Sequence, residues 1–313
     1  MISVELNREI YSSLKENSIF FLKRGIRELN EHTSNNTTSL TVEGAKISYL
    51  FLQTALELAI KAYLIKFGDI DSIIFKKKNK VNIPLNTEDL RMMFEKGKLK
   101  FISLESLKQF IVDKLNNEQL SSIEDFQKFR NETLHFSPNF VEEDLFDFNY
   151  DFIYFIVHVI LPILSDFNHD EHAASASYQK ILNHTDFLNL IDLPIYIEKM
   201  RAMAKEESSN VFHCPNCWKE TFGIEEGRCY CCTFEDFDNI QLGYADCIKC
   251  RASSSVVYNK LNIRDNDDIW VNSKCLNCKD CLEVFRCPNC EEAYAFEIEN
   301  DLNKCTPKNC VNC

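Results

Sequence analysis

The sequence predicts a mainly α-helical bundle followed by small, β-rich, cysteine-containing modules. Over the first 205 residues, apolar side chains recur at helical spacing, helix-forming residue types are frequent, and Gly and Pro are rare. All 15 cysteines lie after residue 213, mostly as Cys-x-x-Cys pairs. We therefore expect an all-α bundle over residues 1–205 and three modules over residues 206–245, 246–283 and 284–313.

Helical segments are expected throughout the N-terminal part. The segment Val42–Phe67 is apolar around most of its circumference, which favours a central position in the bundle. Pro138 disfavours helical geometry at Ser137, so the helix before it should end close to His135. The expected helices cover Val4–Glu31, Val42–Phe67, Ser103–Lys114, Glu118–Leu134, Glu143–Asp166 and Thr185–Lys205, with a short helix near Thr87–Glu95.

The most apolar run, Phe152–Leu164, is 13 residues long and contains His158 and Pro162. A membrane-spanning helix needs about 20 residues, so this run predicts a buried core helix and no membrane partner. Pro162 should bend or terminate that helix. The N-terminus lacks the basic, apolar and small-residue pattern of a signal peptide. Together with the Cys-x-x-Cys pairs, this indicates a reducing, cytoplasmic compartment.

The cysteine pairs have the spacing of zinc ribbons, in which two pairs on tight turns build a tetrahedron of thiolates. Taken in order, the pairs give three sites, with 11, 24 and 19 residues between the two pairs of each site. Protein fills every ligand position, whereas a catalytic zinc keeps one open, so we expect about three structural Zn²⁺ ions per chain. The expected ligands are Cys214, Cys217, Cys229 and Cys232, then Cys247, Cys250, Cys275 and Cys278, then Cys287, Cys290, Cys310 and Cys313.

Cys231, Cys281 and Cys305 are left over, and they keep the exact partition of ligands open. Cys281 could pair with Cys278 in place of Cys275, and Cys305 could replace a cysteine of the terminal pair. The region itself is acidic, because residues 206–313 carry 11 Lys and Arg against 19 Asp and Glu, a net charge of −8. Such a charge repels phosphate. We therefore expect RNA to bind the first domain and the ribbons to contact a regulatory protein or to cap the structure.

Arg130, Asn131 and His135 form a polar constellation near the end of an expected helix. RNA carries its own nucleophile, the 2′-hydroxyl, so its cleavage needs a proton-transferring group and a cation at the phosphate. Histidine suits the first role and arginine the second, while Asn131 could orient the imidazole or the phosphate. Arg130 and His135 start about 140° apart on an ideal helix. Convergence therefore needs either a loosened helix end or a second chain across a twofold axis.

Roughly the first 200 residues resemble the HEPN superfamily of higher eukaryote and prokaryote nucleotide-binding domains. In the family motif a polar residue directly follows an Arg, and a His comes a few residues later; the segment Arg130–His135 matches this motif. The segment Phe51–Asp69 resembles the family's long second helix. The resemblance implies a homodimer with facing motif helices and metal-independent endoribonuclease activity, and the analogy extends to toxins and antiviral-defence effectors. Ser137 stands where some family toxins carry a nucleotidylated tyrosine, so that form of control is not expected.

Glu57 is a weaker catalytic candidate. It precedes Lys61 by four residues, so an ion pair on a helix edge is the simpler interpretation, although the family sometimes has an acidic residue here that approaches the motif. The alternative function is a catalytically silent bundle that binds RNA, a nucleotide or a protein, with the zinc ribbons as its interaction modules. A zinc-dependent adaptor that dimerises through the bundle is a third interpretation.

Overall fold

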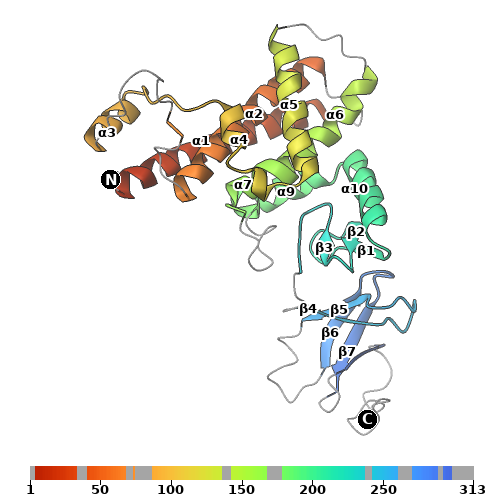
Figure 1. Cartoon of the computed structure of the whole chain (residues 1–313). Helices are drawn as coiled ribbons and strands as arrows, with labels where there is room; N and C mark the ends of the chain where they lie inside the picture. Colours follow the sequence, from red (N-terminus) through yellow and green to blue (C-terminus); the bar gives the residue numbers. More distant parts are fainter. Residues whose placement is uncertain are drawn as a thin grey trace. The chain divides into compact units, whose positions relative to one another are not determined.

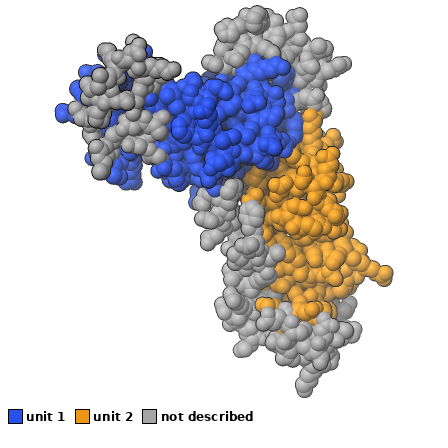
Figure 2. Space-filling view, viewed as in Figure 1, with its two compact units in different colours: residues 1–168, 176–190 blue, residues 169–175, 191–313 orange. Residues whose placement is uncertain are grey.

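In this computed structural model the chain divides into two compact units, one helical and one that carries the strands (Figure 1, Figure 2). Unit 1 comprises Met1–Asn168 and Ala176–Leu190, and unit 2 comprises His169–Ser175 and Ile191–Cys313. The structure describes residues 4–33, 41–67, 73–74, 87–135, 142–167, 178–236, 242–259, 270–287 and 292–297. For residues 30–33, 130–135 and 142–147, among others, this description covers the backbone alone.

Unit 1 is built around two long antiparallel helices, α1 and α2. Ser18 Oγ donates to the Ala55 carbonyl at 2.7 Å, and a Cβ added at Gly25 would lie 2.9 Å from Leu52 Cδ2, so small side chains on α1 allow close packing. The helices through α9 are α1 (Val4–Thr33), α2 (Val42–Phe67), α3 (Thr87–Glu95), α4 (Leu104–Lys108), the 3₁₀ turn η2 (Val112–Lys114), α5 (Asn117–His135), α6 (Glu142–Tyr154), the π-helix η3 (Phe155–Ile160), α7 (Leu161–Leu164) and α9 (His184–Ile191).

The predicted bounds of α1, α2, α3 and α5 are confirmed to within two residues. The single helix expected over Ser103–Lys114 is wrong, because α4 ends at Lys108 and Ile111, with φ −120° and ψ 1°, leaves the helical region. The helix expected over Thr185–Lys205 is divided, because a new helix starts at Pro194 and the residue before a proline avoids helical geometry.

The helix around Pro162 continues through the proline instead of ending there. A proline at position 162 removes the N–H that an α-helix would direct at the carbonyl of His158. Gln119 of α5 supplies the missing donor, since its Nε2 lies 2.6 Å from His158 O. The preceding turn widens into η3, in which Leu161 N–H donates to Ile156 O. This hydrogen bond joins the start of α5 to η3, most of whose residues are buried.

Unit 2 begins with α10 (Pro194–Glu207) and contains two antiparallel sheets. The first sheet has the order β1-β2-β3, and the second has the order β4-β5-β6-β7-β8 and curls until β4 approaches β8. Arg201 of α10 pairs with Glu220 at 3.3 Å, which joins the helix to the first sheet. The strands are β1 (Val211–His213), β2 (Glu220–Gly223), β3 (Arg228–Cys229), β4 (Leu242–Ala245), β5 (Val256–Asn259), β6 (Trp270–Cys275), β7 (Cys281–Arg286) and β8 (Ala293–Phe296).

The structure divides into two compact units, a coarser division than the four segments expected from the sequence. Contacts divide the chain near Ile191 and not at residue 205, so α10 groups with the cysteine-rich part. Strands β7 and β8 pair directly, so residues on both sides of the expected boundary at 283/284 share one sheet. Among the helices of the described chain, none is both long enough and apolar enough to cross a membrane.

Candidate metal centres and the Arg130–His135 segment

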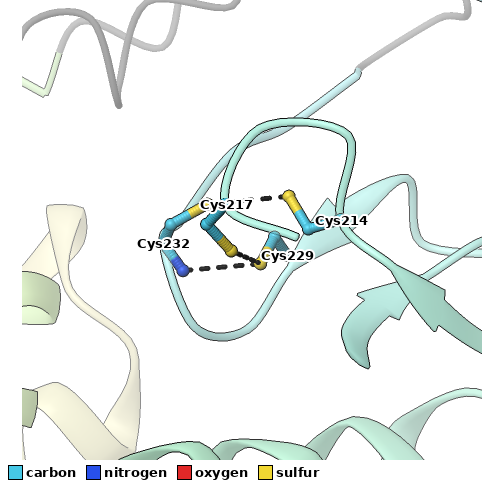
Figure 3. A group of neighbouring side chains, drawn as sticks. All are labelled: Cys214, Cys217, Cys229 and Cys232. Carbon is cyan, nitrogen blue, oxygen red and sulfur yellow. Dashed lines mark hydrogen bonds between the residues drawn. The ribbon is translucent and has the colours of Figure 1, made fainter. Parts of the chain in front are cut away.

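Two groups of four cysteines lie close together in unit 2. In each group the four sulfur atoms all lie within 4.8 Å of one another. Figure 3 shows the first group, whose side chains converge from the β1–β2 turn and from the turn after β3. The first tetrad is Cys214, Cys217, Cys229 and Cys232, and the second is Cys247, Cys250, Cys275 and Cys278. Both tetrads are those expected from the order of the Cys-x-x-Cys pairs.

All four Cys-x-x-Cys pairs in these tetrads form the same kind of turn. In the turn at Cys214, its N–H donates to Lys219 O at 2.8 Å and Trp218 N–H donates back to Cys214 O at 3.0 Å. The turns at Cys229, Cys247 and Cys275 repeat both bonds at the same spacing. The residue after each second cysteine has a positive φ, between 55° and 67°: Trp218, Thr233, Arg251 and Lys279. Two sulfurs per turn therefore point to one side of the backbone.

The spacing of the sulfur atoms fits zinc. A tetrahedral zinc with Zn–S bonds of about 2.3 Å has sulfur atoms about 3.8 Å apart. The closest sulfur pairs are 3.7 Å apart in the first tetrad and 3.7 and 3.8 Å apart in the second. A disulfide needs about 2.05 Å. The tetrads therefore have the size of a four-thiolate metal site, and protein ligands fill all four positions.

The first tetrad is buried, and this has a chemical consequence. Cys214 and Cys232 have no exposed surface, and burial raises the pKa of both thiols well above the ordinary value. Four thiolates in such an environment need a compensating cation, and metal binding must release their protons. The second tetrad is more open, because Cys250 and Cys278 are partly exposed. Removal of the metal should therefore be easier at the second site.

Further donors surround the sulfur atoms and repeat from one tetrad to the other. Thr221 Oγ1 lies 3.2 Å from Cys229 Sγ, and Ser255 Oγ lies 3.3 Å from Cys275 Sγ. An asparagine of one turn also reaches a sulfur of the opposite turn in each tetrad. Asn216 Nδ2 lies 3.4 Å from Cys232 Sγ, and Asn277 Nδ2 lies 3.4 Å from Cys250 Sγ. The amide donors and the Thr221 hydroxyl can stabilise thiolates and fix their orientation toward a metal, whereas the Ser255 hydroxyl donates its hydrogen to Ala252 O.

The asparagine, threonine and serine side chains beside the sulfur atoms were not predicted from the sequence, although part of the signal was present in it. Both asparagines stand directly before the second cysteine of their pair, in Cys214-Pro-Asn-Cys217 and Cys275-Leu-Asn-Cys278, and the terminal pair Cys310-Val-Asn-Cys313 repeats the pattern. Thr221 and Ser255 carry no such signal, because strand pairing brings them to the sulfur atoms from outside the motif.

The three leftover cysteines have different surroundings. Cys231 is buried outside the first tetrad, with its sulfur 3.8 Å from Ile191 O. Cys281 is exposed on β7 and is not part of the second tetrad, so the alternative pairing of Cys278 with Cys281 is not adopted. Cys305 lies outside the described residues.

Of the third expected site, only Cys287 belongs to the described chain. It is buried at the end of β7, and its N–H donates to Glu292 O at 2.8 Å, which is the first bond of the turn seen at the other four pairs. Cys290, Cys310 and Cys313 lie outside the described residues. The third site therefore stays a prediction.

The two tetrads are directly connected through the backbone. His213, immediately before Cys214, donates its N–H to Leu276 O at 2.9 Å, and its ring Nδ1 lies 2.8 Å from the same oxygen. Leu276 follows Cys275, the third ligand of the second tetrad. Two contacts of His213 thus join the first turn of one tetrad to a turn of the other.

The Arg130–His135 segment forms the last turns of α5, which ends at His135 as expected. The side chains of Arg130, Asn131 and His135 lie outside the described part of the structure. The backbone stays α-helical through the whole segment, so Arg130 and His135 leave the helix about 140° apart. An unwound helix end before Pro138 therefore does not bring them together within the segment.

Glu57 of α2 forms the ion pair that its spacing predicted. Its Oε1 lies 2.5 Å from Lys61 Nζ, and the same ammonium lies 4.9 Å from the centroid of the Phe101 ring. Lys61 is buried, whereas Glu57 is more than one third exposed. Glu57 therefore acts here as the counter-ion of a buried lysine.

Comparison with protein-family models, with curated proteins and with solved structures gave no match.

Proposed function

We propose that the chain is a metal-independent endoribonuclease of the HEPN type that acts as a homodimer, with its zinc centres in a structural role. The observation that supports this most is the position of the Arg-Asn-x-x-x-His segment on the last turns of α5, in an N-terminal helical unit. Because the backbone of α5 is helical through His135, Arg130 and His135 start about 140° apart around the helix, which favours a site shared between two chains. A twofold axis beside the end of α5 would bring Arg130 of one chain to His135 of the other.

The proposed chemistry needs no metal at the reacting atoms. The RNA 2′-oxygen attacks the adjacent phosphorus, His135 moves a proton, and the bond from phosphorus to the 5′-oxygen breaks. The 5′-oxygen leaves as a hydroxyl, and the other fragment retains a 2′,3′-cyclic phosphate. Arg130 stabilises the charge that grows on the phosphate, and Asn131 orients its neighbours. The closed cysteine tetrads have no free ligand position and contribute folding free energy.

Cleavage of RNA by purified protein in the presence of EDTA tests this proposal. Arg130→Ala and His135→Ala should each lower the rate on the order of 10²-fold or more, and Asn131→Ala should lower it less. Lys128→Ala removes a positive charge from the same helix and is the control for Arg130→Ala. His184→Ala removes a histidine elsewhere and is the control for His135→Ala. Circular dichroism and zinc content should be unchanged in every variant. Products with 3′-hydroxyl and 5′-phosphate ends, formed only with Mg²⁺, would show that water is the nucleophile.

The second candidate function is a catalytically silent scaffold whose zinc modules bind a partner. It is favoured by the surface beside the first tetrad, where Trp218 is 41% exposed and Lys274 Nζ lies 3.9 Å from the centroid of its ring. Exposed tryptophan with a stacked cation is typical of interaction surfaces. Intact RNA after incubation with the wild-type protein under all conditions, together with measurable binding of that RNA or of a protein, would favour this function.

A further inference from the structure

Unit 1 contains a cleft of about 260 Å³ that the proposed nuclease mechanism does not use. It is lined by one face of α5, by α6 and by Tyr49 of α2. Figure 1 shows α5 and α6 beside α2 in this unit. The volume is slightly below the range of about 300–1,000 Å³ that is usual for drug-sized ligands. The cleft therefore suits a small molecule.

Aromatic rings form most of the inner surface of this cleft. The Phe129 ring lies 4.4 Å from Tyr49 and 4.8 Å from Phe148, and Tyr150 lies 5.8 Å from Tyr154, measured between centroids. Tyr49, Phe126 and Tyr154 are buried, and the others are half-buried. The rings pack against one another and against the core.

Carboxylates stand at the opening of the cleft. Glu118 and Asp125, seven residues apart on one face of α5, and Asp151 of α6 line it, and all three residues are exposed. No lysine, arginine or histidine is found among the lining residues that the structure describes. The pKa of Tyr150 is raised, mainly by burial and further by the negative charges of Glu118 and Asp151. The electrostatic field of these carboxylates therefore extends into the cleft.

This combination excludes most classes of ligand. Phosphates and carboxylates would be repelled by three negative charges. A divalent metal ion needs several ligand atoms around one point, and the groups of three or more such ligands among the described residues are the two cysteine tetrads, not these carboxylates. A neutral apolar molecule would gain from the rings but nothing from the carboxylates. A cation attached to a small apolar group gains from both, because the faces of aromatic rings attract cations.

We propose that this cleft binds a small organic cation, with an alkylated ammonium group held against the aromatic wall and its charge balanced by Glu118, Asp125 and Asp151. The site is independent of the nuclease proposal, because it requires neither Arg130 nor His135. It lies on the stretch of α5 directly before that segment, between Glu118 and Phe129.

Binding of choline to the full chain tests the proposal, with 3,3-dimethylbutan-1-ol as the neutral molecule of the same shape. Titration calorimetry and saturation-transfer NMR should give a choline dissociation constant on the order of 0.1–10 mM and at least tenfold weaker binding of the alcohol. Equal affinity for the two molecules would contradict the role of charge. Absence of saturable choline binding up to about 50 mM would overturn the site itself.

Variants locate the bound cation. Asp151→Asn should weaken choline binding about three- to tenfold, because it removes one charge a few ångströms from the ligand through a partly aqueous medium. Phe129→Leu should weaken it on the order of two- to thirtyfold by removing an aromatic face. Asp113→Asn, an exposed carboxylate outside the cleft, is the matched control and should leave the affinity unchanged. Asp151 is at the surface, so its variant should fold, and an unchanged affinity there would place the cation elsewhere.

Discussion

Gln119 fastens the start of α5 through three hydrogen bonds, and replacing it should destabilise unit 1 by a predictable amount. Its Oε1 accepts from Asn116 N at 2.8 Å, its own N–H donates to Asn116 Oδ1 at 2.8 Å, and its Nε2 donates to His158 O. Gln119→Glu keeps the first two bonds and replaces the donor to His158 O by a carboxylate oxygen, which accepts only and repels the carbonyl. An unsatisfied, partly buried carbonyl costs about 1–3 kcal/mol, so we expect a loss of that size. Gln119→Ala also removes the cap, which adds roughly 0.5–2 kcal/mol.

A double-mutant cycle with Pro162→Ala tests whether Gln119 replaces the hydrogen bond that Pro162 cannot donate. An alanine restores the N–H that the helix directs at His158 O, so Gln119→Glu should then cost less than about 0.5 kcal/mol. Urea unfolding followed by circular dichroism at 222 nm reports the helices, whereas both tryptophans, Trp218 and Trp270, lie in unit 2 and report that unit by fluorescence. Gln109→Glu is the matched control. If Gln119→Glu lowers the free energy of unfolding equally with and without Pro162, Gln119 Nε2 does not replace the N–H that Pro162 lacks.

The remaining predictions concern unit 2. Thr221→Val keeps the side-chain volume but removes the hydroxyl beside Cys229 Sγ. The zinc affinity of the first site, measured by competition with a chromophoric chelator, should therefore fall about 10–100-fold. An unchanged affinity would contradict the role of the hydroxyl. Burial opposes ionisation of Glu225, yet hydrogen bonds from Ser208 and Asn210 hold its pKa below the ordinary value of 4.5. The stability that wild type gains over Glu225→Gln should therefore be complete above about pH 4.5 and disappear as pH falls through the lowered pKa; a pH-independent difference would exclude this linkage. Mass spectrometry of the native full chain should find about three zinc ions, and a value of one or none in folded protein would exclude the three-site interpretation.

Local spacing explains why much of this structure was predictable. The helix α2 was placed from a continuous apolar pattern, and the end of α5 followed from Pro138. The tetrads followed from the Cys-x-x-Cys pairs, because a spacing of three positions between the two cysteines fixes both the turn and the direction of the two sulfurs.

Features that depend on distant residues were not predictable. The continuation of the helix through Pro162 depends on Gln119, whose hydrogen-bond acceptor His158 is 39 residues away in the sequence. The pairing of β7 with β8, and the approach of Thr221 to Cys229, follow from sheet register and leave no periodic signal. The break after α4 lies in a segment whose buried residues keep helical spacing, Leu104, Leu107 and Ile111, so periodicity alone predicts an uninterrupted helix.

We propose that Arg130 and His135 act together across two chains, and mixing two inactive variants tests this most directly. Arg130→Ala and His135→Ala proteins should each be inactive alone. When the two are unfolded together and refolded as a mixture, about half of the dimers are heterodimers, and each heterodimer holds one complete pair of Arg130 and His135. The mixture should therefore recover about one quarter of the wild-type rate of cyclic-phosphate formation in EDTA. No recovery, with heterodimers demonstrated by native mass spectrometry, would contradict a site shared between chains.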